Sequence, residues 1–203
     1  MIVGIIAKTT DLPLTLIGSV AGISTARCGN GKERARNCFK LGHLSVFEHV
    51  SVTWRVSGIS RACSHQLVRH RLASFCQMSQ RYTRVVTESS GWYVAPQCAK
   101  GDDSIGVEFE LAMAQCAAHY RSLIEKGVKP EDARYVLPEA TRTNIAVTMN
   151  LREFMSFYAL RTDKAAQWEI RELAERMLDT LDSSCGEWEQ FAQMVKGGID
   201  GKR

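Results

Sequence analysis

The segment at residues 69–82 (RHRLASFCQMSQRY) constrains this chain more than any other. It opens with three consecutive residues that carry or can carry positive charge, and a further cation, Arg81, lies near its end. Cations crowded together repel one another unless an anion lies among them, so such a segment is unsuited to a hydrophobic core. The hydroxyl groups of Ser74, Ser79 and Tyr82 add hydrogen-bonding capacity. Cations at a helix C-terminus are common on solvated surfaces, but this combination favours an anion pocket, most simply for phosphate.

The segment is predicted to follow a helix directly. A helix is expected over residues 60–71, and residues 72–82 are expected to form a loop. On that helix Gln66, Arg69 and His70 lie on one side, because their spacing is i, i+3 and i+4. The end of the helix and the loop would then direct their donors at one place.

Length and charge indicate an ordinary globular protein. The chain has 203 residues, enough for one domain with a core of its own. Lys and Arg number 26 and Asp and Glu 22, which gives a net charge of +4. This mild excess suits a protein that handles anions, but it is too weak to indicate a nucleic-acid-binding surface. We expect a single domain over residues 1–203 and no nucleic-acid partner.

The cysteine pattern indicates a reducing compartment. The chain lacks Cys-x-x-Cys and the Cys/His spacings of zinc sites, so no metal is expected. The apolar residues 1–7 lack the basic region of a signal peptide, and no apolar run approaches the ~20 residues that span a bilayer. We therefore expect reduced, mostly buried thiols in a cytoplasmic protein without a membrane partner. The cysteines are Cys28, Cys38, Cys63, Cys76, Cys98, Cys116 and Cys185.

Hydrophobic periodicity predicts a mixed fold. Apolar and polar residues alternate most clearly at 50–57, and further strands are predicted at 1–7 and 141–149. Besides 60–71, helices are predicted at residues 32–41, 104–126, 130–135, 150–161, 164–182 and 187–195. Asn150 and Glu153 have the spacing of a capping box. Because strands and helices do not alternate as βαβ units, the fold class is predicted to be α+β with an antiparallel sheet.

Three motifs in order resemble one known family. Residues 69–82 contain Arg-His-Arg, seven further residues, a serine and Gln-Arg-Tyr. Residues 42–49 (GHLSVFEH) and 160–170 (LRTDKAAQWEI) are similar to that family's upstream and downstream segments. Together they resemble the flavin-dependent thymidylate synthases. The resemblance implies helices packed on a curved, mostly antiparallel β-sheet, and a homotetramer whose active sites are shared between subunits.

The resemblance also implies two anionic ligands, dUMP and FAD. The predicted dUMP set comprises Gln66, Gln77, Ser79, Arg81, Arg134 and Arg161. The predicted flavin set comprises Ser45, Glu48, Arg69, His70, Arg71, Asn150, Arg152 and Ser156. His43 matches a family histidine near the flavin, where a folate or a nicotinamide would stack. Arginine suits both sets, because its planar fork binds phosphate oxygens bidentately.

The implied reaction is the reductive methylation of dUMP to dTMP, in which NADPH reduces FAD and methylenetetrahydrofolate gives the one-carbon unit. Cys76 lies inside the motif but has no adjacent base at a defined spacing, so no thiolate nucleophile is expected. Ser79 is expected at the catalytic centre as a donor that positions substrate. Arg161 is expected to stabilise the negative charge that develops on uracil.

The chain departs from the family pattern at three positions. Ala165 and Ser156 stand where some relatives carry histidine and asparagine, and Gln77 replaces a glutamate. These changes bear on FAD binding more than on the class of reaction. Other function classes stay open: a nucleic-acid-binding module that uses the Arg-His-Arg segment, which would show strong salt dependence, an inactive homologue, and a flavin oxidoreductase without methyl transfer.

Overall fold

The computed structural model describes residues 1–24, 26, 29–89, 91–101 and 103–200. They form two compact units, which are considered separately. The first unit contains residues 1–56, 67–75 and 146–203, and the second contains residues 57–66 and 76–145. The expected single domain over residues 1–203 stays a prediction.

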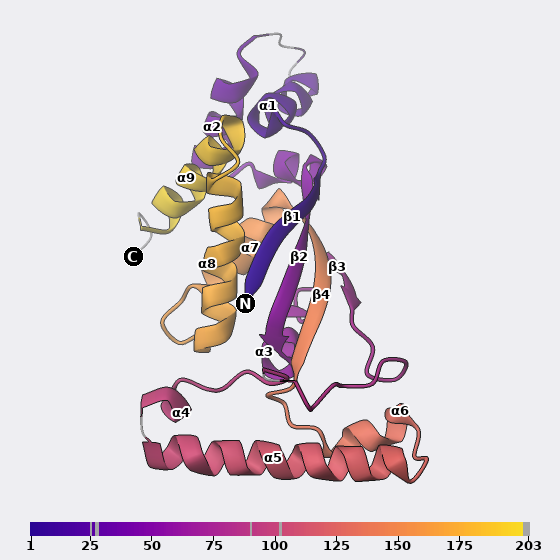
Figure 1. Ribbon diagram of the computed structural model, residues 1–203. Coiled ribbons are helices and arrows are strands. Elements are labelled where there is room, and N and C mark those ends of the chain that lie inside the picture. Colours follow the sequence, from indigo (N-terminus) through magenta and orange to yellow (C-terminus); the bar gives the residue numbers. More distant parts are fainter. Residues whose placement is uncertain (25, 27–28, 90, 102, 201–203) are drawn as a thin grey trace. The chain divides into compact units, whose positions relative to one another are not determined.

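The strands form one four-stranded antiparallel sheet. The strands are β1 (Ile2–Lys8), β2 (Ser51–Ser60), β3 (Ala73–Gln77) and β4 (Arg142–Asn150), and their order in the sheet is β1-β2-β4-β3 (Figure 1). Mixed helix and strand with an antiparallel sheet confirms the predicted α+β class.

Two helices cover the sheet in the first unit, α7 (Leu151–Arg161) and α8 (Trp168–Asp182). Side chains alternate between the two faces of a strand, and within residues 51–56 of β2 the buried ones are Val52, Trp54 and Val56. The Trp54 ring stacks on Phe154 of α7 with ring centroids 5.1 Å apart, and its indole N–H donates to the Thr180 hydroxyl of α8 at 2.9 Å. The alternation that predicted β2 therefore builds the contact between the sheet and both helices.

Three further helices of this unit lie together, α1 (Pro13–Ile23), α2 (Gly31–Lys40) and α9 (Glu187–Asp200), with the 3₁₀ helix η1 (Leu44–His49) beside them (Figure 1). Neither α1 nor η1 was predicted from the sequence. Helix α2 ends where expected, because Gly42 adopts a φ of +73°, which favours glycine.

Helices α1 and α2 touch through their backbones at Gly18. A Cβ atom added to Gly18 would lie 1.8 Å from the carbonyl oxygen of Gly31. Gly18→Ala is therefore expected to force the two helices apart and to lower the free energy of unfolding by about 3 kcal/mol, the upper end of overpacking effects. Urea unfolding measures this. Gly4→Ala is the control, since nothing lies within 4 Å of its added Cβ; equal losses in both variants would contradict the prediction.

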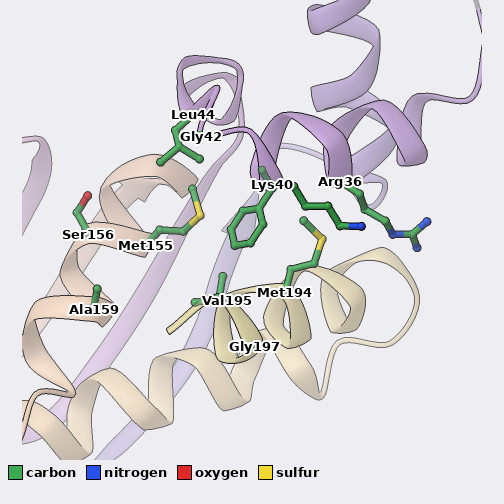
Figure 2. Close-up of a pocket in the computed structure, with 12 residues that line it drawn as sticks. Arg36, Lys40, Gly42, Leu44, Met155, Ser156, Ala159, Met194, Val195 and Gly197 are labelled. Atoms are coloured by element: carbon green, nitrogen blue, oxygen red, sulfur yellow. The ribbon is translucent and has the colours of Figure 1, made fainter. Parts of the chain in front are cut away.

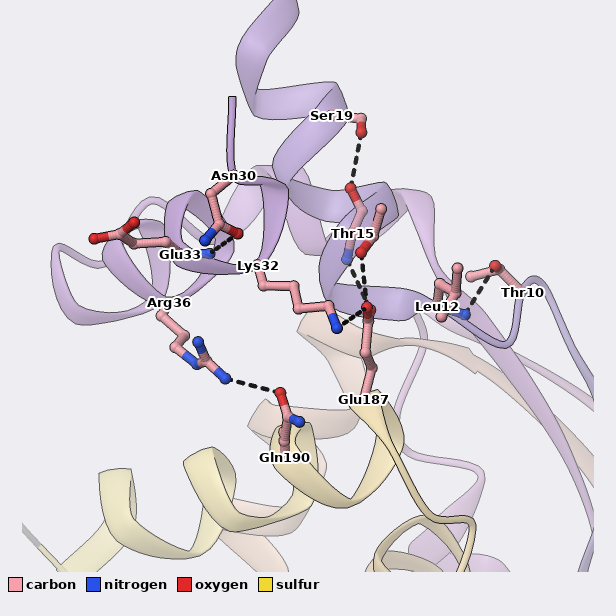
Figure 3. A network of polar contacts seen from close by, with 10 residues as sticks. All are labelled: Thr10, Leu12, Thr15, Ser19, Asn30, Lys32, Glu33, Arg36, Glu187 and Gln190. Atoms are coloured by element: carbon pink, nitrogen blue, oxygen red, sulfur yellow. Dashed lines mark hydrogen bonds and ion pairs between the residues drawn. The ribbon is translucent and has the colours of Figure 1, made fainter. Parts of the chain in front are cut away.

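Glu187 holds these three helices together from a buried position (Figure 3). Its Oε2 accepts from the Thr15 backbone N–H at 2.8 Å, and its Oε1 accepts from the Thr15 hydroxyl at 2.7 Å. Lys32 Nζ lies 3.1 Å from Oε1. Thr15 lies in the first turn of α1, whose N–H groups have no partner within their own helix, and the N-cap Leu12 has no side-chain acceptor. The carboxylate of α9 therefore caps α1 and pairs with α2.

Glu187 makes stability depend on pH. Burial would raise the pKa of Glu187, but the hydrogen bonds from Thr15 and Lys32 outweigh burial and place this pKa below its ordinary value. A lowered pKa gives stability that is present above the unfolded-state pKa of about 4.3 and is lost as the pH falls through the folded-state value. Glu187→Gln should lower the free energy of unfolding at pH 7 by about 1–3 kcal/mol. The difference should close in thermal unfolding below about pH 4. Exposed Glu189→Gln is the control, and a pH-independent difference would refute the assignment.

The second unit is built around its long helix α5 (Asp103–Glu125). Its small core contains Trp92, Met113 and Ala117. Tyr93 pairs with Thr141 in an isolated antiparallel bridge. The short elements are α3 (Arg61–Leu67), α4 (Cys98–Gly101), α6 (Pro130–Ala133) and the 3₁₀ helix η2 (Arg134–Val136).

Two predictions around the Arg-His-Arg segment were wrong. Helix α3 ends at Leu67, so Arg69 and His70 do not share a helix face with Gln66. The helix begins as expected, since the Ser60 hydroxyl accepts from the Cys63 N–H at 2.9 Å. The expected loop 72–82 contains strand β3, because pairing with β4 satisfies its backbone groups.

The cysteines are less buried than predicted. Among the six described cysteines Cys63 is buried, whereas Cys76, Cys98 and Cys185 are exposed, so the expectation of mostly buried thiols was wrong. Cys28 lies outside the described residues.

Within the described part of the chain, no helix combines the length and the apolar character needed to cross a membrane.

Candidate functional site

The best-defined polar cluster of the first unit surrounds the buried side chain of His70. His70 Nδ1 lies 3.1 Å from Glu153 Oε1, and Arg161 Nε donates to His70 Nε2 at 3.0 Å. The Phe157 ring meets the imidazole edge to face, with ring centroids 5.0 Å apart. This cluster joins His70 of the predicted flavin set to Arg161 of the predicted dUMP set.

The hydrogen bonds of His70 define its protonation. Burial lowers the pKa of His70 below its ordinary value, the hydrogen bond with Glu153 opposes this, and the charge of Arg161 adds to the lowering. Arginine has donors and no acceptor, so Nε2 must be the unprotonated nitrogen. The proton is therefore on Nδ1 and is donated to Glu153. His70 is a neutral imidazole between a carboxylate and a guanidinium.

Three further residues of the predicted flavin set lie at α7: Asn150 at its N-cap, and Arg152 and Ser156 within the helix. Asn150 caps the helix by accepting from the Glu153 N–H at 2.8 Å, which confirms the predicted cap. Arg152 forms an ion pair with Glu48 of η1, and both side chains are about half exposed. The Ser156 hydroxyl donates to the Arg152 backbone carbonyl at 3.2 Å, one helical turn away. Glu48, Arg152 and Ser156 therefore lie close together.

The remaining predicted ligands of this unit are exposed. Arg69 and Arg71 flank His70 in sequence, but their side chains lie at the surface while His70 is buried. His43 and Ser45, at the start of η1, are exposed as well. These four side chains can reach an external anion or ring without first leaving a buried site.

A cavity of about 740 Å³ lies in the first unit between α2, α7 and α9 (Figure 2). Met155 and Met194 line it, and Arg36 and Lys40 of α2 lie along one side. Ser156 of the predicted flavin set also lines it. Its volume falls in the range of small-molecule sites. The cavity thus adjoins the predicted flavin set at one residue.

In the second unit, two arginines of the predicted dUMP set converge on Glu131. Arg81 Nε lies 2.6 Å from Glu131 Oε2, and Arg134 Nε donates to the Glu131 backbone carbonyl at 3.0 Å. The Ser79 hydroxyl oxygen accepts from the backbone N–H groups of Arg81 and Tyr82, at 3.1 and 3.3 Å. Arg81 is therefore paired with the Glu131 carboxylate, while Arg134 is bonded to the backbone of the same residue and Ser79 to the backbone at Arg81.

The two glutamines of the predicted dUMP set have different surroundings. Gln77 Nε2 donates to the hydroxyls of Ser64 and Thr143, at 2.8 and 3.2 Å. Gln66 is partly buried at the end of α3. The hydrogen bonds of Gln77 stay inside the second unit, so a ligand would compete with them for this amide.

The comparisons with known proteins agree with these features. A family model described as thymidylate synthase complementing protein matches residues 9–185. The chain belongs to this family. A flavin-dependent thymidylate synthase from Geobacter sulfurreducens is 52% identical over 139 residues, which are 68% of this chain and 59% of the relative. One from Pyrococcus furiosus is 45% identical over 141 residues, 69% of this chain and 58% of the relative. The resemblance to flavin-dependent thymidylate synthases is thereby confirmed, and the chain spans about three fifths of these relatives' length.

Solved structures support the fold. ThyX from Helicobacter pylori, solved with FAD and dUMP, superposes with a TM-score of 0.77 at 22% identity, covering 97% of this chain and all of that one. The UMP/dUMP methylase PolB from Streptomyces cacaoi, bound to 5-Br dUMP, gives a TM-score of 0.79 at 24% identity over 97% of this chain and 94% of that one. At such identities these likenesses show the fold.

Three charged residues near the predicted ligands were not predicted as site residues from the sequence. Glu153 was predicted only as a capping residue, yet its carboxylate contacts His70. Glu131 gathers Arg81 and Arg134. Burial lowers the pKa of the Arg61 guanidinium, Glu139 opposes the lowering, and Arg134 adds to it, which places Arg61 near this group. The spacing of Glu131, three residues before Arg134, was the signal available for it.

Proposed function

We propose that this protein carries out the flavin-dependent reductive methylation of dUMP to dTMP, with FAD as cofactor, methylenetetrahydrofolate as carbon donor and NADPH as reductant. Membership of the family supports the reaction class. The observation that carries the proposal is the hydrogen bond between Arg161 and His70 at 3.0 Å. It joins a residue expected to contact the uracil to one expected to face the flavin, so substrate and cofactor would meet at this pair.

The donors of the first unit fit a flavin dinucleotide. Arg69 and Arg71 are exposed guanidinium groups, and Arg152 lies in reach of the hydroxyl-bearing Ser156. Guanidinium and hydroxyl donors suit a diphosphate, which a chain without a glycine-rich phosphate loop must bind through side chains. Bound FAD would supply the hydride chemistry. Ser45, Glu48 and Asn150 would complete this set, and the exposed His43 would stack on a folate or nicotinamide ring.

The donors of the second unit fit the phosphate of dUMP. Arg81 is paired with the Glu131 carboxylate and Arg134 with the Glu131 backbone carbonyl, and a phosphate carries more charge and more acceptor oxygens than either group. On binding, both arginines would exchange Glu131 for the phosphate. The Ser79 oxygen accepts two backbone N–H groups, which orients its hydroxyl proton for donation to dUMP. Ser79 thereby positions substrate and forms no covalent bond.

Arg161 would act on the reacting ring. Carbon C5 of uracil becomes nucleophilic when negative charge moves onto the neighbouring carbonyl oxygens, and a fixed guanidinium lowers the energy of that charge. A partly buried cation is worth more here than a solvated one, since water screens it less. No enzyme nucleophile is then required.

A homotetramer with shared sites is part of the proposal. Leu72, Tyr82, Tyr135 and Leu160 are between 57% and 84% exposed. Each is the sequence neighbour of a predicted ligand arginine. Large apolar side chains beside charged ligands are typical of surfaces that another subunit covers. The cytoplasmic location stays a prediction.

The test is a synthesis assay with omissions. Purified protein is incubated with FAD, NADPH, methylenetetrahydrofolate and dUMP, and dTMP is measured by chromatography while each component is left out in turn. Formation of dTMP only in the complete mixture supports the reaction, the cofactor, the carbon donor and the reductant. Absence of dTMP from a folded protein with FAD bound would overturn it.

A flavin oxidoreductase without methyl transfer is the second candidate. The observation in its favour is that Glu131 occupies Arg81 and Arg134, while Gln77 donates to Ser64 and Thr143. If these contacts persist, dUMP is excluded although the flavin set is intact. The same assay separates the two functions, because this candidate oxidises NADPH at a rate that dUMP does not change and forms no dTMP.

A further inference from the structure

Three side chains of helix α7 form a stripe beneath the His70 imidazole. Glu153, Phe157 and Arg161 follow one another at intervals of four residues, so they lie on one face of the helix. The distance from the first to the last is about 12 Å along the axis, at 1.5 Å per residue. The imidazole bridges this distance, with one nitrogen at Glu153, the other at Arg161 and its ring against Phe157.

The bridge works only in one protonation state. With the proton on Nδ1, the ring donates to Glu153 and accepts from Arg161, and both contacts are favourable. If Nε2 also takes up a proton, it becomes a donor that faces another donor, and a second cation lies 3.0 Å from Arg161 Nε. Like charges at this separation repel strongly where water is excluded.

We propose that Glu153 and His70 are positioning residues, which hold the Arg161 guanidinium while His70 is neutral and release it when His70 takes up a proton. Neither residue was assigned this role by the sequence motifs, which place His70 toward the flavin and Glu153 at a helix cap. As a statement about dUMP binding, the proposal rests on the proposed function of Arg161.

The surroundings of His70 favour the holding state at neutral pH. The charged groups that face its ring are Glu153 and Arg161, both from α7, and Phe157 covers the ring edge to face. Burial disfavours the imidazolium, Glu153 favours it, and Arg161 disfavours it, so the pKa lies below the ordinary value. Release of Arg161 is therefore expected only at a pH below the range in which an unperturbed histidine takes up its second proton.

The contacts of His70 with Glu153 and Arg161 together form what we call the clamp. The first measurement tests the clamp without any reaction. Long-range ¹H–¹⁵N NMR distinguishes the two nitrogens of each of the five histidines, and His70→Gln assigns the His70 signals. Neutral His70 with its proton on Nδ1 is the expected result. A proton on Nε2 at neutral pH would overturn the proposal, because Nε2 then accepts nothing from Arg161.

The second measurement is the affinity for dUMP of the FAD-loaded protein, by calorimetry between about pH 7.5 and pH 5. Glu153→Gln keeps an acceptor for Nδ1–H and should change affinity less than about twofold, while Glu153→Leu removes it and should weaken binding roughly tenfold, as for one lost hydrogen bond to a charged group. The wild type should lose affinity as His70 protonates. The phosphate of dUMP also titrates, near pKa of about 6, so His70→Gln serves as the reference without that imidazole.

The outcomes separate cleanly. The proposal is supported if Glu153→Leu binds dUMP more weakly than Glu153→Gln. It also requires that the affinity for dUMP falls more steeply with decreasing pH in the wild type than in His70→Gln. Equal affinities in both Glu153 variants, or equal pH profiles, would overturn the clamp. If Glu153→Leu does not fold, the pH profiles and the NMR tautomer still decide. If the wild type does not bind dUMP at all, the proposed function fails, and the NMR result alone decides whether the clamp exists.

Discussion

Arg161→Ala is expected to lower kcat/KM for dTMP formation by about 10²- to 10³-fold, the usual cost of removing one donor that stabilises developing charge. Arg161 is partly buried at the last position of α7, and its Nε–H is held by His70 at 3.0 Å. Alanine removes both the charge and its fixed orientation. The proposed contacts of Arg81 and Arg134 with dUMP would remain, so binding of dUMP should weaken about tenfold and the rest of the loss should fall on kcat.

The fold should survive this substitution. The substitution leaves one imidazole nitrogen of His70 unpaired and removes a cation from the C-terminus of α7. Together these changes should lower the free energy of unfolding by about 1–2 kcal/mol. Arg176→Ala is the matched control, because its guanidinium pairs with Glu172 at 2.8 Å on an exposed helix surface. Initial rates of dTMP formation and thermal unfolding should be measured for both variants. Normal methylation by Arg161→Ala would show that its assigned role is wrong.

Trp54→Ala is expected to lower the free energy of unfolding by about 3–5 kcal/mol. The side chain is fully buried between strand β2 and helices α7 and α8. Its removal leaves a large cavity, ends the stacking on Phe154 and leaves the Thr180 hydroxyl without its indole donor. Close-packed cores relax only in part around such a cavity, so most of the cost remains.

Trp54→Phe separates packing from the hydrogen bond. Phenylalanine keeps an aromatic ring against Phe154 but has no N–H for Thr180, so a loss of about 1–2 kcal/mol is expected. Denaturant unfolding of the wild type and the two variants measures both losses in the free energy of unfolding. The slope of this free energy against denaturant concentration should be the same in all three proteins. A loss below about 1 kcal/mol for the alanine variant would mean that Trp54 does not anchor the helices to the sheet.

Local patterns predicted most of the regular structure. The alternation at residues 50–57 correctly predicted strand β2, and the capping box at Asn150 correctly predicted the start of α7. Gly42 lies just after the end of α2, as predicted. Each depends on residues within about one helical turn or a few strand positions, so the sequence contains all the interacting partners. The order of three motifs likewise identified the family.

The errors occurred where distant partners decide. The sequence predicts a loop at residues 72–82, yet pairing with β4 makes 73–77 a strand. The preceding helix was extended to Arg71, yet it ends at Leu67, and His70 is bonded to a residue 83 positions away. The composition of a segment indicates how well its side chains are solvated. Strand pairing and burial depend on contacts with residues that are distant in the sequence.

The sequence by itself determined which side chains are available: the arginines, the serines and the single histidine of the segment at 69–82. Only the tertiary structure decided how they are held. It buried His70 while leaving Arg69 and Arg71 exposed, and it placed Glu153 against the imidazole and Glu131 between Arg81 and Arg134. The physical reason is that a hydrogen bond needs a partner within about 3 Å. The fold alone brings together groups that lie 50 and 83 residues apart in the chain.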